Sequence, residues 1–410
     1  MRMFLLMCLL VAVAIMSGCV QRTVDDLPQS TRIDREIVAR ASLAVDVADD
    51  ATEEPVRQAT FHTRDDGTIV FYISHQAPRL HPMRYGALFF RDLVFDRSGG
   101  TLVVEVLYGE DSLGGDVTLV NLVNDGLLDS AMITQWTAWA GLNELANLES
   151  LPFVFLSYEE AWEAYSGTFG RWVAQNVIES SSNVRVIGWQ TNGLRHFTNN
   201  VRPIYTPDDM ISLMMRSPQN SAHLATYDAL GSASISMAFG EVYDAISEGR
   251  IDGQDNPIAN IFSAGFHEVQ RYLSLSYHMF SAAPIIVSND LWEYLSEEHR
   301  QVLLDSAEWA SLLQERRIAV TERDMINAML EQGMQVNHVN TDLFIEAVMP
   351  VWVEYMGRFG TEFAEVASRY VTSPNALPLR FVAAGAHLAL GYYYGYVHGY
   401  YDGYSDGYYD

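Results

Sequence analysis

Short apolar runs and longer stretches of helical character alternate along most of the chain. Five runs have the length and composition of strands, at residues 68–74, 102–107, 131–133, 184–189 and 213–216. Helices are predicted between them, from Pro82 to the stop at Ser98-Gly99-Gly100, from Gly114-Gly115 to about 126, at 159–174, from 206–209 onward, and over the charged stretch 296–333. Strands that alternate with helices predict an α/β architecture with largely parallel sheets.

The first eighteen residues have the pattern of an export signal. Arg2 supplies a positive start, and Phe4 to Ile15 is an apolar run too short to span a bilayer as a helix. Met16-Ser17-Gly18-Cys19 resembles the lipobox of bacterial lipoproteins, although methionine stands where leucine is usual. We therefore expect a signal peptide at 1–18 and lipidation of Cys19, which would anchor the protein to a membrane. The alternative is an ordinary signal peptide that contains a cysteine.

Two further segments differ in composition from the rest. Residues 19–60 are polar and acidic, which is typical of a tether. In the tail, 376–410, glycine recurs at every fourth position from 391 to 407, with tyrosines between. Residues 381–401 carry no charged side chain, but tyrosines and two histidines make a membrane helix a poor interpretation. The tail is either disordered or a helix that needs a partner, since five helical glycines cost roughly 5 kcal/mol.

Charge and composition exclude several classes of protein. The chain has 52 acidic and 25 basic residues, a net charge of −27, which disfavours a nucleic-acid partner. Every basic residue is arginine, so Schiff-base lysine chemistry and lysine-containing phosphate loops are excluded. The two cysteines lie at positions 8 and 19, which excludes cysteine-rich zinc sites and disulfides within the mature chain.

Sequence signatures of enzymes are scarce. No GxSxG elbow or glycine-rich phosphate loop occurs, and His267-Glu268 lacks the second histidine of a zinc helix. The abundant carboxylates are those of a solvated acidic surface. We therefore expect neither catalytic activity nor a metal or cofactor.

Three segments carry a family resemblance. They are Trp189-Gln190-Thr191-Asn192-Gly193-Leu194-Arg195, then Met214-Met215-Arg216-Ser217-Pro218, and finally Met237-Ala238-Phe239-Gly240-Glu241-Val242-Tyr243 with Asp252-Gly253-Gln254-Asp255-Asn256-Pro257. Together they resemble the dicarboxylate- and sialic-acid-binding family of solute-binding proteins from tripartite ATP-independent periplasmic (TRAP) transporters. The resemblance extends from about residue 69 to about 367.

The resemblance implies roles for individual residues. Arg216 falls on the family's arginine that bridges a substrate carboxylate, and Arg195 on a second arginine seen in many members. Asn256 falls on an asparagine that binds the same carboxylate, and Phe239 on an aromatic residue that packs on the ligand. Gln76 lies where the first lobe lines the cleft. Ser217 departs from the usual apolar residue.

A planar guanidinium matches the two oxygens of a carboxylate, which supports these assignments. The alternative interpretation is that both arginines form structural salt bridges, for which an acidic chain offers many partners. The three segments in register favour the binding interpretation.

The resemblance also implies a two-lobed fold that closes over its ligand by a hinge. Lobe I would comprise 61–193 with 282–321, and lobe II 194–281 with 322–375. The implied function is capture of a small organic acid outside the cytoplasmic membrane and its delivery to the membrane permease subunits. A ligand-sensing receptor of the same fold, or less plausibly a hydrolase, is the alternative. An accessory protein or a second copy would bind the tail. The sequence does not identify the acid.

Overall fold

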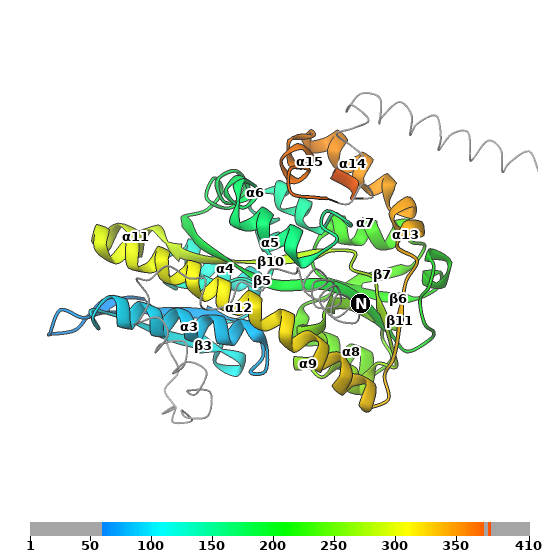
Figure 1. The fold of residues 1–410 in the computed structure, drawn as a ribbon, viewed down its shortest axis with the longest axis horizontal. Coiled ribbons are helices and arrows are strands. Elements are labelled where there is room, and N and C mark those ends of the chain that lie inside the picture. The colour runs from blue at the N-terminus through cyan, green and yellow to red at the C-terminus, as the bar shows by residue number, and fades with distance from the viewer. Residues whose placement is uncertain (1–59, 373–375, 379–410) are drawn as a thin grey trace, which may run out of the picture. The chain divides into compact units, whose positions relative to one another are not determined.

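A computed structural model describes residues 60–372 and 376–378 of the chain. Strands and helices alternate through this part, and the strands form two groups that share the long strand β5, Val184–Asn199 (Figure 1). The predicted α/β architecture is confirmed.

The first group of strands contains most of the early apolar runs. β2 pairs in parallel with β3 and β4, β1 adds an antiparallel edge, and β10 runs antiparallel to β4 and to the first half of β5. The bounds are β1 His62–Thr63, β2 Ile69–His75, β3 Leu102–Tyr108, β4 Ser130–Met132 and β10 Phe280–Ser288. Parallel strands covered on both sides explain why these runs are apolar without alternation.

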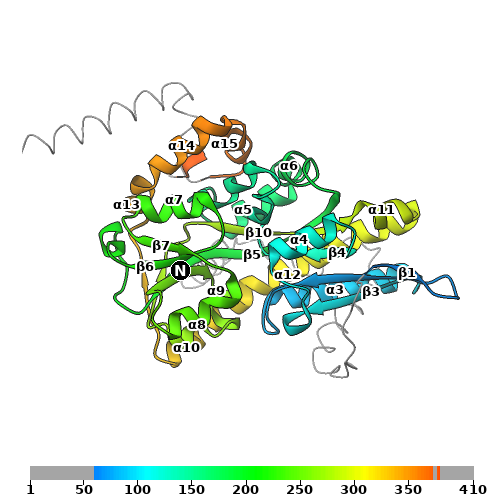
Figure 2. The same ribbon diagram turned by 180° about the vertical axis from the view of Figure 1, so that it is seen from behind.

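The second group is built around the later half of β5, which pairs antiparallel with β8 and β9. β6 lies between β7 and β8 and is parallel to both, and β11 is parallel to β9. Figure 2 shows β6 and β7 on one side of the molecule and β1 and β3 on the other. The bounds are β6 Met214–Ser217, β7 Ala233–Ser236, β8 Gly253–Pro257, β9 Tyr272–Leu275 and β11 Gln335–His338.

Strand β5 is much longer than the run at 184–189 predicts. Its polar second half, from Gln190 onward, is wholly buried. Residues 190–194 pair with β10, residues 195–199 pair with β8, and the last three also pair with β9. Gly193 sits near the change of sheet at φ 134°, a conformation that favours glycine. The lobe boundaries given above stay a prediction.

The helices cover both groups of strands. Their bounds are α3 Pro82–Arg97, α4 Asp116–Asn124, α5 Tyr158–Ser166, α6 Thr168–Val173, α7 Ser221–Ala229, α8 Val242–Ser247, α9 Ile258–Ser263, α10 Phe266–Val269, α11 Asn289–Tyr294, α12 Glu297–Glu331, α13 Thr341–Ala347, α14 Met349–Phe359 and α15 Glu362–Ala367. Short 3-10 helices occur at η3 Gly109–Asp111, η4 Trp136–Trp139, η5 Glu144–Ser150, η7 Pro207–Met210 and η8 Phe239–Glu241, and a π-helical turn at η6 Ala174–Ile178.

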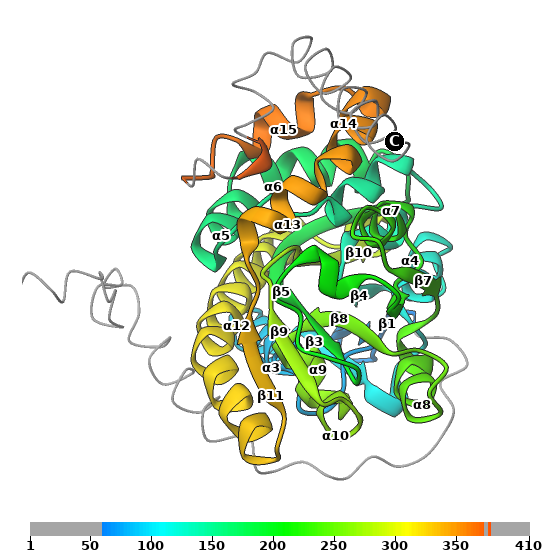
Figure 3. The ribbon, with the colours of Figure 1, turned by 90° about the vertical axis from the view of Figure 1, so that its right-hand side faces the viewer.

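Helix α12 is the long helix that the charged stretch predicts. It begins where the Ser296 side chain accepts a hydrogen bond from the backbone N–H of His299, and it ends before Gly333 at φ 99°. It lies against α3, β5 and α9, and thus contacts elements of both groups of strands (Figures 1 and 3).

Two predicted helices differ from the structure. The helix at 159–174 is broken at Gly167, where the backbone leaves helical geometry and the hydroxyl of Tyr370 approaches closely. The start signal at 206–209 yields only the short helix η7, because the backbone becomes extended at Ile211 and Ser212 then takes a left-handed conformation two residues before β6.

Aromatic side chains fill much of the core. Trp136, Trp139 and Trp352 are completely buried within one large apolar cluster, and a second cluster surrounds Phe266 between α8, α9 and the end of α12. Burial of this kind fixes the elements that carry the site.

Several sequence predictions lie outside the described residues. They are the signal peptide at 1–18, lipidation of Cys19, the tether at 19–60 and nearly all of the tail. Among the helices that are described, none is both long and apolar enough to cross a membrane.

Candidate functional site

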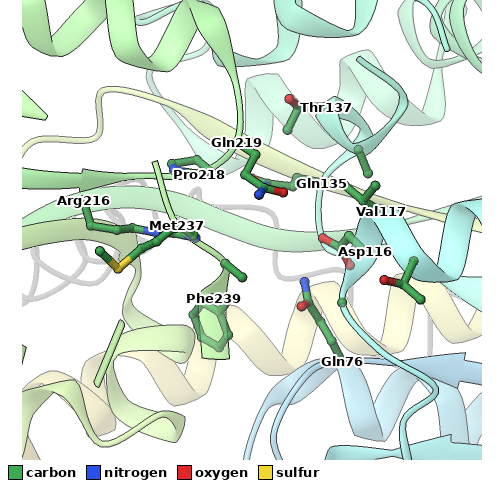
Figure 4. Close-up of a pocket in the computed structure, with 14 residues that line it drawn as sticks. Gln76, Asp116, Val117, Gln135, Thr137, Arg216, Pro218, Gln219, Met237 and Phe239 are labelled. Atoms are coloured by element: carbon green, nitrogen blue, oxygen red, sulfur yellow. Dashed lines mark hydrogen bonds between the residues drawn. The ribbon is translucent and has the colours of Figure 1, made fainter. Parts of the chain in front are cut away.

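A cavity of about 190 Å³ lies between loops of the first group of strands and the ends of β6 and β7 (Figure 4). Its lining is Gln76, Gly115, Asp116, Val117, Thr118, Gln135, Thr137, Ala138, Arg216, Pro218, Gln219, Met237, Ala238 and Phe239. A smaller recess shares four of these side chains, those of Gln76, Gln135, Arg216 and Phe239. The rest of its lining is Ala77, Thr134, Asn192, Arg195, Asn256 and Asn260.

Arg216 lines both spaces from the middle of the second sheet. It lies in β6 between two parallel strands and is 4% exposed. Its Nε and Nη2 atoms donate to the carbonyl oxygen of Met237 at 3.1 and 2.9 Å. Two of five guanidinium N–H groups are used in this way, which leaves three for a ligand.

No acidic side chain of the described residues forms an ion pair with Arg216. Burial and the neighbouring Arg195 lower the pKa of Arg216 to about 10. Asp255 and Glu241 act on this pKa in the opposite direction, at distances beyond an ion pair. The side chain therefore remains charged at neutral pH, buried and without an ion-pair partner among the described residues.

Arg195 has a different environment. Its Nε atom lies 2.6 Å from Oδ2 of Asp255, and both side chains are almost fully buried. Its Nη2 atom donates to the backbone oxygen of Asp255 at 2.5 Å. The alternative interpretation of the sequence, a structural ion pair, therefore describes Arg195, although this side chain also reaches the recess.

Asp255 is the centre of a buried network. Besides Arg195, its carboxylate accepts hydrogen bonds from His223 Nε2 at 2.8 Å, Tyr227 Oη at 2.5 Å and His278 Nε2 at 3.2 Å. Burial alone raises the pKa of Asp255, but Arg195 and His223 outweigh it and hold that pKa well below its usual range. Burial lowers the pKa of His223 to about 4, so that histidine is neutral. The network neutralises the charge of Arg195 with one carboxylate.

The segment around Asp255 shows why its motif has these residues. A Cβ atom on Gly253 would lie 2.2 Å from the backbone oxygen of Thr198, so the packed strands require glycine. Gln254 Nε2 donates to Thr198 Oγ1 at 2.7 Å, and its Oε1 accepts from Asn256 Nδ2 at 2.5 Å. Asn256 is thereby held in the wall of the recess.

The segment Met237 to Tyr243 supplies two parts of the site. The carbonyl oxygen of Met237 orients Arg216, and Phe239 lines both spaces with its ring 5.5 Å from that of Phe266. Glu241 Oε2 accepts from the backbone N–H of Ala238 at 3.0 Å, which fixes the turn.

The opposite wall contains Gln76 and an acidic residue that the sequence reasoning missed. Gln76 Nε2 donates to Thr134 Oγ1 at 3.1 Å. The Asp116 carboxylate accepts from the backbone N–H of Thr134 at 3.0 Å and from its hydroxyl, and it lies near Gln76 in the cavity wall (Figure 4). Burial raises the pKa of Asp116 to about 6. The helix start at Gly114-Gly115 was visible in the sequence, but it does not show that the next residue faces a cavity.

The structure thus brings all five predicted ligand-binding residues, Arg195, Arg216, Asn256, Phe239 and Gln76, to the recess. Gln135, Asn192 and Asn260 join them in the recess, and Thr137 lines the neighbouring cavity; these four were not predicted. In the described part of the chain, no group of three or more His, Cys, Asp or Glu residues is arranged to hold a metal ion.

Known proteins share both the sequence pattern and the fold. A 2,3-diketo-L-gulonate-binding periplasmic protein of Escherichia coli K12, YiaO, is 30% identical over 247 residues, which cover 60% of this chain and 74% of that protein. The C4-dicarboxylate-binding protein DctB of Bacillus subtilis 168 is 24% identical over 72% of this chain and 84% of that protein. The crystal structure of a TRAP periplasmic solute-binding protein from Polaromonas sp. JS666, bound to D-erythronate, has a TM-score of 0.69 and 29% identity, covering 73% of this chain and 98% of that one.

Residues 73–358, more than half of the chain, match the family described as bacterial extracellular solute-binding protein, family 7. The match spans every segment on which the predicted resemblance rests. The TRAP solute-binding family predicted from the sequence is confirmed, and the chain belongs to family 7 of the bacterial extracellular solute-binding proteins.

Proposed function

We propose that this protein captures a small organic acid outside the cytoplasm and delivers it to the membrane subunits of a TRAP-type transporter. The observation that carries the proposal is Arg216, a buried guanidinium that lines a cavity, keeps three N–H groups beyond the two that bond Met237, and forms no ion pair among the described residues.

A buried charge without a partner is costly, and a ligand that supplies the opposite charge removes that cost. A carboxylate presents two oxygens at the spacing of parallel guanidinium N–H groups. Charge-assisted hydrogen bonds contribute roughly 1.5–3 kcal/mol each, and micromolar binding needs about 8 kcal/mol. Two such bonds, with amide contacts and packing on Phe239, reach this range.

The relatives support the same class of ligand. The E. coli protein is named for 2,3-diketo-L-gulonate, the Bacillus protein for C4-dicarboxylates, and the Polaromonas protein holds D-erythronate. These compounds differ in length and in hydroxyl groups, but each has a carboxylate. A carboxylate on Arg216 is the recognition that all would share.

The neighbouring residues have distinct roles in this proposal. Asn256 donates to the ligand's carboxylate beside Arg216, and Phe239 packs against the ligand's carbon chain. Gln76 binds the ligand from the opposite wall. Arg195, tied to Asp255, adds the N–H groups that its ion pair leaves free.

The location of the protein follows from its first residues. Cleavage after Gly18 and acylation of Cys19 would hold the protein at a membrane beside the permease subunits. The tail beyond residue 378 would dock on an accessory protein or a second copy. These features lie outside the described residues and are proposed from the sequence.

Replacement of Arg216 by lysine tests the proposal, because lysine keeps the charge and loses the planar fork. Calorimetry with a panel of carboxylic acids first identifies a ligand of the natural protein. Arg216→Lys should then weaken its binding by roughly an order of magnitude or more. Arg250→Lys is the matched control, since Arg250 is half exposed and pairs with Glu248 away from the cavity. Equal affinities of natural protein and Arg216→Lys would overturn the carboxylate assignment.

A further inference from the structure

We propose that the captured acid carries a single carboxylate and a hydroxylated chain, and that Asp116 makes the site reject dicarboxylates. This inference rests on the proposed function and specifies the ligand within the broad class of organic acids.

On the side of the cavity formed by the second group of strands, the charged side chains can compensate the charge of one anion. Arg195 and Arg216 are the cationic side chains among the described residues that line the cavity and the recess. The charge of Arg195 is matched by Asp255 at 2.6 Å, within a network that is closed off from solvent. Arg216 forms no ion pair in the described chain, and Asp255 and Glu241 act on it only at longer range. One ligand carboxylate therefore completes the charge balance, and a second one has no cation to meet.

The opposite wall repels a second carboxylate. Asp116 is the acidic residue among the described lining residues, and it is 7% exposed. Its oxygens are fixed by the backbone N–H and hydroxyl of Thr134, so it does not turn away from the cavity. An anionic group placed against this wall would lie beside a carboxylate in a partly desolvated space, where like charges interact strongly.

The size of this discrimination has an upper limit set by protonation. Since burial raises the pKa of Asp116 to about 6, the carboxylate is mostly ionised at pH 7. Thr134, Gln76 and Gln135, which hydrogen-bond to it, are neutral. Glu149 interacts with Asp116 electrostatically, and burial raises the pKa of Glu149 well above its usual range. Protonation of Asp116 would relieve the repulsion, which limits the effect to about tenfold at pH 7 and about a hundredfold at pH 8.

The rest of the recess suits hydroxyl groups. It contains five side-chain amides, from Gln76, Gln135, Asn192, Asn256 and Asn260. An amide both donates and accepts, as a hydroxyl does. The Oδ1 atom of Asn192 is buried and has no hydrogen-bond partner in the part of the chain that the structure describes. A site with buried amide groups discriminates strongly against ligands that cannot satisfy them.

Matched pairs of acids test this inference. D-Galactonate and galactarate have the same carbon chain, as do D-gluconate and D-glucarate, and D-erythronate and meso-tartrate. The members of each pair differ in having one or two carboxylates. Calorimetry on the folded protein at pH 7 should give tighter binding, by up to about tenfold, of the singly charged member of whichever pair binds best. The preference should grow at pH 8. Butyrate and hexanoate, which have no hydroxyl groups, should bind at least tenfold more weakly than the aldonate of similar length.

Asp116→Asn separates a charge effect from a structural one. The asparagine keeps the shape and can still accept from Thr134, so the ratio of the affinities for the aldonate and the aldarate reports on the charge. The affinity for the aldarate should rise, and the preference between the two should disappear. Asp125→Asn, at the exposed end of the same helix, removes one charge outside the cavity and should leave the preference unchanged.

Each outcome is decisive. Equal or tighter binding of aldarates, malate or succinate by the natural protein would overturn the inference but leave the proposed function intact. Binding of hexanoate as tight as that of an aldonate would overturn the requirement for hydroxyls. If Asp116→Asn weakens both members of a pair equally, Asp116 is a structural residue and its assigned role is wrong. If no carboxylic acid of the panel binds, the proposed function itself fails.

Discussion

Replacement of Asp255 by asparagine should destabilise the protein strongly without removing any ligand contact. The change leaves the buried Arg195 guanidinium without its carboxylate at 2.6 Å and weakens hydrogen bonds from His223, Tyr227 and His278. Loss of one partner of a buried ion pair typically costs about 3–5 kcal/mol. Because a folded protein has a stability of about 5–15 kcal/mol, this is a large fraction of the total.

The loss is measured as the free energy of unfolding from urea titrations followed by tryptophan fluorescence. Trp136, Trp139 and Trp352 are buried and report on unfolding of the core. The melting temperature should fall by an amount on the order of 10 °C, taking about 2–4 °C for each kcal/mol as in domains of about 150–250 residues. Asp228→Asn, one residue after Tyr227 on the exposed face of α7, is the matched control and should change stability by less than about 0.5 kcal/mol.

The same variant tests the charge balance of the site. With its counter-charge removed, Arg195 becomes a second buried cation at the recess, and an anionic ligand should restore part of the lost stability. The rise in melting temperature caused by saturating aldonate should therefore be larger in Asp255→Asn than in the natural protein. A loss of stability under about 1 kcal/mol, or an unchanged ligand effect, would refute the view that Asp255 compensates Arg195.

Four further predictions concern the fold, the pH dependence and the two ends of the chain. Gly253→Ala should lower the free energy of unfolding by at least about 2 kcal/mol, because its Cβ would collide with a backbone oxygen at 2.2 Å. Burial raises the pKa of Glu322 to about 7 from 4.5, so the folded state retains a proton that the unfolded state releases. The stability that this group contributes is therefore lost as pH rises through 7. Glu322→Gln should be more stable than the natural protein at pH 8 by about 1–3 kcal/mol. Cys19→Ser should release a ligand-competent protein from membranes, measured by fractionation. Deletion of residues 379–410 should leave ligand affinity unchanged while removing a co-purifying protein or a dimer, seen by size-exclusion chromatography.

Each of these predictions has a matched control or a contradicting result. Gly357→Ala, in helix α14 with open space at the Cβ position, should not destabilise the protein, and an equal loss in both glycine variants would contradict the steric argument. For Glu322, the gain should vanish near pH 4, and a gain that does not depend on pH would exclude the protonation mechanism. Cys19→Ser protein that stays with membranes after high-salt washing points to another anchor. Loss of ligand binding after the deletion would show that the tail contributes to the lobes; the truncation starts at 379 because Ala376 and Leu377 are buried.

The sequence by itself determined the fold class, the family and the position of Arg216. These features depend on local patterns, which one amino-acid sequence is enough to show. Examples are the apolar strands, helix starts such as Pro82, and the segment Asp252 to Pro257. Gly253 in that segment is required because a Cβ atom there would collide with the backbone oxygen of Thr198 in the neighbouring strand. Its presence in the sequence therefore carried structural information. The extent of β5 was not predicted, because its second half is polar and is buried only through its neighbours on both sides.

The tertiary structure alone decided which arginine has an ion-pair partner among the described residues. Arg195 and Arg216 look alike in the sequence, but Asp255, sixty positions after Arg195, forms an ion pair with the first and not with the second. Asp116 likewise lies a hundred positions before Arg216 and shares a cavity with it. Charge balance in a buried site depends on distances between segments remote along the chain, and one sequence in which acids are abundant offers too many candidate partners to select among them.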